Sequence, residues 1–218
     1  MCFFLFFGIT KAIAQKVFNA FFEPEIELGY KVTDNYSHSF AFENRNKFYE
    51  NGDSEYKILY IEFAHFSEYI FSEDYSIGLG IQYRFAENFK ASEENELRFQ
   101  QQFELSPKNN GSALKHRFRN EQRFYKSKIK YRLRYRLNAN FDIGESFGTS
   151  TYIGADTEML FELAQTQKPE LEQRFSTVIG WVITPNTQLE LGTQYRLADY
   201  TKELKHELFL VMGFEFKL

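Results

Sequence analysis

Polar and apolar side chains alternate strictly in residues 128–143, "KIKYRLRYRLNANFDI", with cations at the polar positions up to Arg136, and this pattern limits what the chain can fold into. Lys130 and Arg132, for example, alternate with Tyr131 and Leu133. A period of two would scatter both classes around a helix, whereas on a strand it separates them onto two faces. The segment therefore predicts a β-strand with one wet face and one apolar face. Such a strand fits a half-buried soluble sheet, and it also fits a membrane barrel with lipid outside and water inside.

The same alternation recurs along the whole chain and favours the barrel. Turn signals such as "ENGD", "SPKNNGS", "GESFG" and "TPNT" separate the alternating segments. Most segments are longer than the roughly 5 to 6 residues of a usual soluble strand, and they reach the about 9 to 11 that a tilted strand needs to cross a bilayer. A closed sheet also pairs every backbone group inside hydrocarbon. The segments cover residues 18–32, 36–45, 56–66, 75–85, 96–105, 114–124, 128–143, 151–163, 171–183, 188–197 and 206–218.

The composition agrees with a barrel whose outward residues are apolar and whose inward residues are charged. The chain holds 26 Phe and 14 Tyr among 218 residues, yet its mean hydropathy is −0.48. The net charge of −4 gives no global positive field that would favour nucleic acid. Nucleic-acid binding also needs cations and stacking rings on one surface, whereas the pattern puts them on opposite faces. We expect no nucleic-acid partner.

The N-terminus predicts an export signal in residues 1–14. The apolar run "CFFLFFGI" is followed by "AIAQ", whose small residues suit cleavage before Gln15. The run is too short for a helix that spans a bilayer, which needs about 20 apolar residues. A buried N-terminal strand is the alternative. Cys2, the only cysteine, lies inside the predicted signal, so residues 15–218 offer no disulfide and no thiolate.

The C-terminus supports an outer-membrane location. In "FLVMGFEFKL" the apolar residues share one face up to Leu218, which resembles the C-terminal signal of bacterial outer-membrane barrels, although Phe is the commoner last residue. The predicted fold is all-β, a transmembrane antiparallel barrel over residues 15–218. Single-chain bacterial barrels have an even number of strands, so the eleven segments favour about twelve strands, with ten as the alternative. The long segment interrupted by Pro24 is the place where two strands could have been merged.

Several motifs together resemble a known family. The segments "GLGIQYRF", "HRFRNEQRF", "YRLRYRL" and "LELGTQYRL" resemble a bacterial outer-membrane barrel family catalogued as domain of unknown function 2490, which is frequent in Bacteroidota. The resemblance covers nearly all of residues 15–218. It implies a Gram-negative outer membrane, contact with outer-membrane lipid, and insertion by the barrel-assembly machinery. It brings no activity, no catalytic residue and no known protein partner.

Charged side chains of the predicted lumen fall into two groups. The basic wall lies on two consecutive segments, and the acidic wall lies around the closure of the barrel. In a ring of twelve strands the two walls would be opposite each other. In one alternative, salt bridges between the walls plug a narrow lumen. In the other, water fills a small pore, and the two walls create an electric field across it. Acids near the basic wall, such as Glu121 and Glu158, favour the plugged form. The basic wall comprises Lys115, Arg117, Arg119, Arg123, Lys130, Arg132, Arg134 and Arg136, and the acidic wall Glu23, Glu25, Glu27, Glu190, Glu207 and Glu215.

The predicted function is non-enzymatic: a narrow or plugged conduit for small solutes, porin-like in kind, or an envelope scaffold. No cofactor is expected, and no histidine and carboxylate cluster has the spacing of a metal site. The alternative is an outer-membrane lipid hydrolase. "HFS" puts His65 and Ser67 on the lipid face near a strand end, and resembles the H-x-S of lipid A deacylases, whereas His38 alternates with the serines on either side of it.

Overall fold

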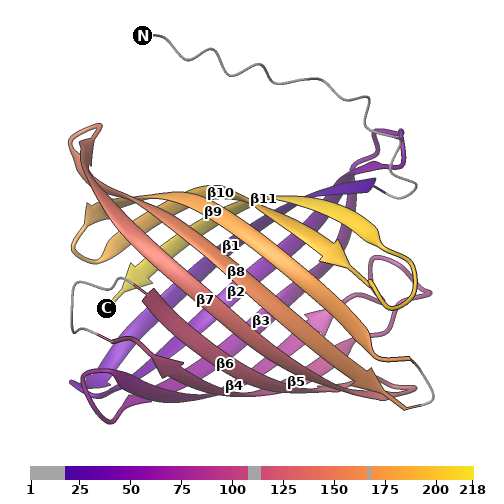
Figure 1. The fold of residues 1–218 in the computed structure, drawn as a ribbon, viewed down its shortest axis with the longest axis horizontal. Coiled ribbons are helices and arrows are strands. Elements are labelled where there is room, and N and C mark those ends of the chain that lie inside the picture. The colour runs from indigo at the N-terminus through magenta and orange to yellow at the C-terminus, as the bar shows by residue number, and fades with distance from the viewer. Residues whose placement is uncertain (1–17, 108–113, 166–167) are drawn as a thin grey trace, which may run out of the picture.

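The computed structural model describes residues 18–107, 114–165 and 168–218, which form a closed β-barrel without helices (Figure 1). The predicted signal in residues 1–14 and its cleavage site lie outside the described residues. Each predicted segment is one strand, extended at most by a few residues. The strands are β1 (Phe18–Thr33), β2 (Tyr36–Glu50), β3 (Lys57–Ile70), β4 (Tyr75–Phe85), β5 (Glu96–Leu105), β6 (Leu114–Phe124), β7 (Ile129–Ser146), β8 (Thr149–Ala164), β9 (Glu170–Thr184), β10 (Thr187–Ala198) and β11 (Lys205–Lys217).

The described residues form eleven strands, so the preference for twelve, and ten as its alternative, was wrong. Consecutive strands pair antiparallel, and the ring closes between β1 and β11, which are parallel. Ten reversals of direction return the chain to its starting direction, so an odd ring has to close with a parallel pair. That pair runs in continuous register from Phe18 with His206 to Gly29 with Lys217. The facing edges of β1 and β11 are therefore paired with each other, and the ring closes without an additional strand.

Pro24 does not divide the first strand. β1 continues through it, and Pro24 is paired in register with Met212 of β11. On the other side the pairing with β2 passes from Phe22 and Asn46 to Glu25 and Glu43 without a partner for Pro24. Proline has no N–H to donate, and it is tolerated where the ladder is interrupted. The proline therefore marks an irregularity within one strand.

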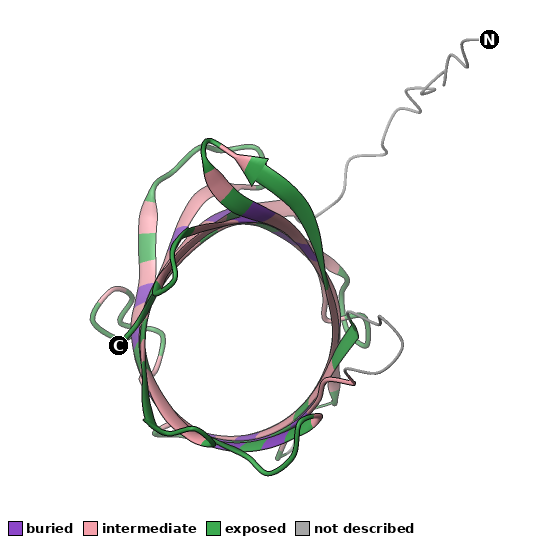
Figure 2. Ribbon diagram, turned by 90° about the vertical axis from the view of Figure 1, so that its left-hand side faces the viewer, coloured by how far each residue is buried: buried purple, intermediate pink, exposed green. Residues whose placement is uncertain are grey.

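Burial is inverted relative to a soluble protein. Figure 2 shows the closed ring of strands, in which short buried stretches alternate with exposed ones. Of the residues described, eighteen buried ones are polar or charged and only six are apolar. Large apolar side chains instead lie exposed, Leu133 at 56% and Phe63 at 51% among them. Soluble proteins rarely bury so many charges and rarely expose so many large apolar groups. The predicted facing of β7 follows the same rule, since the side chain of Arg134 is only 10% exposed.

A few aromatic side chains fill part of the barrel interior near the start of β1. The rings of Phe21 and Phe209 stack with 4.6 Å between their centroids. The guanidinium of Arg196 lies over the ring of Phe209, 3.6 Å from its centroid. Phe209 is fully buried. The interior thus combines a small aromatic cluster at one place with charged walls elsewhere.

Candidate functional site: the charged lumen

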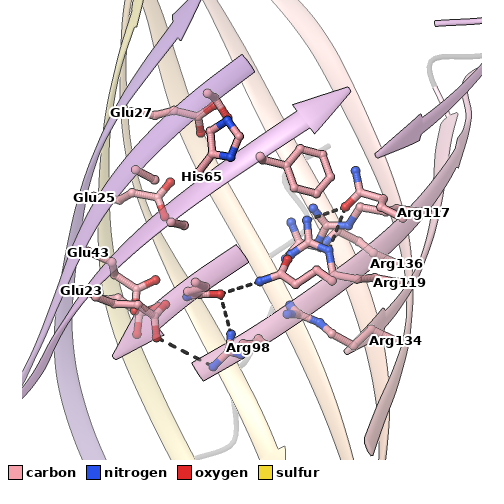
Figure 3. A pocket seen from close by; sticks show the side chains of 18 of the residues that line it. Glu23, Glu25, Glu27, Glu43, His65, Arg98, Arg117, Arg119, Arg134 and Arg136 are labelled. Carbon is pink, nitrogen blue, oxygen red and sulfur yellow. Dashed lines mark hydrogen bonds and ion pairs between the residues drawn. The ribbon is translucent and has the colours of Figure 1, made fainter. Parts of the chain in front are cut away.

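The lumen holds a cavity of about 1260 Å³. Its lining includes Lys205 and Lys217, which lie at the two ends of β11. The cavity therefore extends along the length of a strand. The predicted wall residues line it, except for Lys130 and Glu190. Figure 3 shows Glu23, Glu25, Glu27 and Glu43 on one side, Arg117, Arg119, Arg134 and Arg136 on the other, and Arg98 between them.

The basic wall lies on β6 and β7, half-way round the ring from β1. In their register Arg117 pairs with Arg136, and Arg119 with Arg134. Like charges directly opposite each other on two strands are destabilising. These arginine pairs therefore need carboxylates from adjacent positions to offset their repulsion.

Glu158 and Glu121 supply two of these carboxylates. Arg134 donates to both, with 2.7 Å from Nη1 to Oε1 of Glu121 and 2.7 Å from Nη2 to Oε2 of Glu158. Glu158 also accepts from Arg117 at 3.1 Å and from Arg136 at 3.2 Å. Both glutamates are essentially fully buried. One carboxylate thus serves several guanidinium groups, and this part of the wall keeps an excess of positive charge.

A second ionic cluster lies nearer the other ends of β6 and β7. Arg123 donates from Nε and Nη2 to the two oxygens of Glu96, at 2.7 and 2.8 Å, and its Nη1 binds Glu162. Arg132 and Lys130 both bind Glu162, at 2.6 and 2.5 Å. Bidentate pairs of this kind are the strong and geometrically specific ones. In this cluster each basic side chain has at least one carboxylate partner.

Tyr125, in the turn after β6, completes the second cluster. Its hydroxyl donates to Oε2 of Glu96 at 2.7 Å. Burial, together with the charge of Glu96 and this hydrogen bond, raises the pKa of Tyr125, so the phenol stays protonated and acts as a donor.

The acidic wall is partly neutralised by arginines that the sequence analysis missed. Glu23 binds Arg45 of β2 and Arg196 of β10, the latter at 3.3 Å. Glu215 binds Lys217 at 3.1 Å. Both arginines occur at inward positions of alternating segments, so the period of two was the signal that could have found them.

The other members of the acidic wall differ in their surroundings. Glu190 accepts a hydrogen bond from the hydroxyl of Tyr152 at 2.5 Å and lines a separate cavity of about 120 Å³. Glu25 and Glu207 make no hydrogen bond and no ion pair with any described residue, although both line the main cavity. Two additional carboxylates, Glu43 and Glu62, line the cavity beside them.

The two predicted walls do not interlock. Among residues 18–107, 114–165 and 168–218, no ion pair joins a member of the basic wall to a member of the acidic wall. The partners of each wall lie on the same strands or on strands close by in the ring. The ionic network therefore runs along the barrel wall and leaves the cavity between two poles of opposite charge.

The pairing of β2 with β3 brings His38 to the pair His65 and Ser67, and both histidines also contribute to the lining of the main cavity. Oγ of Ser67 lies 2.9 Å from Nδ1 of His38, and the same nitrogen lies 3.0 Å from Nε2 of His65. Both histidines stack against outward aromatics, His65 with Phe40 at 4.8 Å between ring centroids and His38 with Tyr30 at 5.3 Å. The sequence did not predict the role of His38, because the contact depends on the register of β2 against β3.

The described part of the chain contains no helix that is long and apolar enough to cross a membrane. Within the same residues, no three His, Cys, Asp or Glu side chains are grouped so that they could hold a metal ion.

Comparison with known proteins gives one match. Neither the curated proteins nor the solved structures contain a match to this chain. The family described as "Protein of unknown function (DUF2490)" matches over residues 25–206, which runs from the first strand into the last. With most of its barrel covered by that match, the chain belongs to the DUF2490 family.

Proposed function

We propose that this chain is an exported outer-membrane barrel of a Gram-negative bacterium, and that its lumen is a narrow, hydrated conduit for small polar solutes without a catalytic role. The observation that carries this proposal is the single cavity whose lining includes both ends of β11. An exterior of exposed apolar side chains around a buried polar interior fits a barrel embedded in lipid.

The ionic network supports the hydrated form over the plugged form. A plug requires charges that meet across the lumen, whereas the basic wall finds its carboxylates on the strands beside it. Charges without partners, such as Glu25, are costly in a dry interior, and water in the cavity removes that cost. If the barrel carries no current, its proposed role becomes that of an envelope scaffold without transport.

Planar-bilayer recordings of the purified protein test the conduit. We expect small discrete conductance steps in potassium chloride. A protein that inserts, shifts on gels with heating as folded barrels do, and carries no current would support the scaffold instead. Recovery of the protein from the soluble periplasmic fraction would contradict the proposed location itself.

A lipid hydrolase remains the second candidate because Ser67 lies within hydrogen-bond distance of His38 on the face proposed to meet lipid. A hydroxyl beside an imidazole is the first element of a nucleophilic site. In the usual triad, however, the base uses its second nitrogen for an orienting carboxylate. Here both contacts fall on Nδ1 of His38, and no carboxylate of a described residue hydrogen-bonds to either ring.

Phospholipid and lipid A turnover by the purified barrel separates this candidate from the conduit. We expect no release of fatty acid above that of a Ser67→Ala variant. Release that is lost in both Ser67→Ala and His38→Gln would make the hydrolase the better assignment. Conductance should be unchanged in Ser67→Ala, because Ser67 does not line the main cavity.

A further inference from the structure

We propose that the lumen selects small zwitterionic solutes that carry a carboxylate and an ammonium group, such as short peptides. The carboxylate would bind between Arg117 and Arg119, and the ammonium group would bind at Glu25. This inference rests on the proposed conduit function and names the class of solute that the conduit takes.

The positive pole has guanidinium groups that the protein leaves available. Arg119 hydrogen-bonds to Oε1 of Gln102, at 2.8 Å from its Nε, and makes no ion pair with a described residue. Arg117 follows the same face of β6 and shares its one carboxylate, Glu158, with Arg134 and Arg136. Nε of Arg117 is buried without any hydrogen-bond partner. A carboxylate bound in the cavity between the two guanidinium groups would offset the excess positive charge.

The negative pole has carboxylates in excess. Glu25 pairs in register with Glu43 of β2, so two like charges lie directly opposite each other. Glu43 accepts from the hydroxyl of Tyr60 at 3.0 Å and lies 4.0 Å from Arg45, whereas Glu25 makes neither a hydrogen bond nor an ion pair with any residue that the structure describes. An ammonium group placed at Glu25 would remove this repulsion.

Both poles face the same cavity, as Figure 3 shows, and this decides the class of solute. A solute with only a negative charge is attracted by the arginines but repelled by the glutamates. A solute with only a positive charge is attracted by the glutamates but repelled by the arginines. A zwitterion with separated charges satisfies both poles at once. Electrostatic complementarity of this kind provides specificity, because it also rejects solutes that match one pole alone.

The test uses three probes built on the same tripeptide: triglycine, N-acetyl-triglycine, which lacks the cation, and triglycine amide, which lacks the anion. Binding to the purified full-length protein in detergent is measured by calorimetry, and current block is measured in planar bilayers. We expect triglycine to bind about tenfold or more tightly than either single-charge probe, as expected for one charge-assisted hydrogen bond.

Variants then assign the poles. Arg119→Gln should weaken the binding of triglycine about tenfold and leave the binding of triglycine amide unchanged. Glu25→Gln should also weaken the binding of triglycine about tenfold, but it should leave the binding of N-acetyl-triglycine unchanged. Lys90→Gln is the matched control, since Lys90 pairs with Glu93 in the connection between β4 and β5, outside the cavity lining. Heat-modifiability on gels checks that each variant is folded.

The outcomes separate this inference from the conduit. Equal affinity for all three probes, or no binding of triglycine, would overturn the zwitterion site, even in a protein that conducts ions. Binding with the predicted charge dependence in a protein that carries no current would support the site and contradict the conduit.

Discussion

Arg134 of β7 is bound to Glu158 of β8, with 2.7 Å between Nη2 of the guanidinium and Oε2 of the carboxylate. The other arm of the same guanidinium reaches Glu121 of β6 at 2.7 Å. Arg134 thus joins three neighbouring strands along the barrel wall. Because the strongest charge pairs of the lumen follow the wall, they stabilise the barrel without crossing the cavity.

Arg134 and Arg119 should therefore differ in their effect on stability. Arg134→Gln removes a cation that two buried carboxylates share, although Glu158 keeps Arg117 and Arg136, and it should lower the free energy of unfolding by about 2 to 3 kcal/mol. Arg119→Gln breaks no ion pair and should change it by less than about 1 kcal/mol. Urea unfolding in lipid vesicles measures both. Equal losses in the two variants would contradict this account of the ionic network.

Leu133 should face lipid. Leu133→Arg should lower the free energy of unfolding in a bilayer by about 2 to 4 kcal/mol if the residue lies near the midplane. Ile143 is similarly exposed, at 52%, but lies close to the β7–β8 turn, so Ile143→Arg should cost about 0 to 1 kcal/mol. An Arg at position 133 that is tolerated as well as one at 143 would argue against lipid at this face.

The parallel seam gives a direct test of the strand number. Ile26 and Phe214 are register partners, so an Ile26→Cys/Phe214→Cys double variant of residues 15–218, which contain no other cysteine, should form a disulfide under mild oxidation. Leu208 is the register partner of Ala20 and lies six residues away along β11, about 20 Å from the level of Ile26. The Ile26→Cys/Leu208→Cys pair should therefore stay reduced. A strand inserted between β1 and β11 would prevent both bonds.

Two glycines should respond differently to a methyl group. A Cβ on Gly192 would clash with the backbone carbonyl of Thr177 and with Val178, which cannot move without disturbing β9. Gly192→Ala should cost about 1 to 3 kcal/mol of unfolding free energy. A Cβ on Gly213 would meet only the side chain of Glu190, at 3.7 Å, so Gly213→Ala should be tolerated. The reverse order in urea titrations would mean that the packing of β9, β10 and β11 differs from this structure.

The sequence by itself determined the strands and their faces. A period of two is a local property, so the alternation around Arg132 and Leu133 predicted an inward and an outward face without knowledge of the neighbours. Turn residues placed the strand ends to within a few residues. The closed all-β architecture followed from the same local patterns, whereas the family followed from the resemblance of motifs such as "YRLRYRL".

Tertiary structure alone decided how the strands close and which charges meet. An odd ring closed by parallel β1 and β11 contradicts the even number expected for such barrels, and no local signal distinguishes a missing strand from a parallel seam. The contact of Ser67 with His38 and the sharing of Glu158 among arginines depend on register between strands. Register is set by how all the strands fit together around the ring, because a shift of one residue would exchange the two faces of a strand.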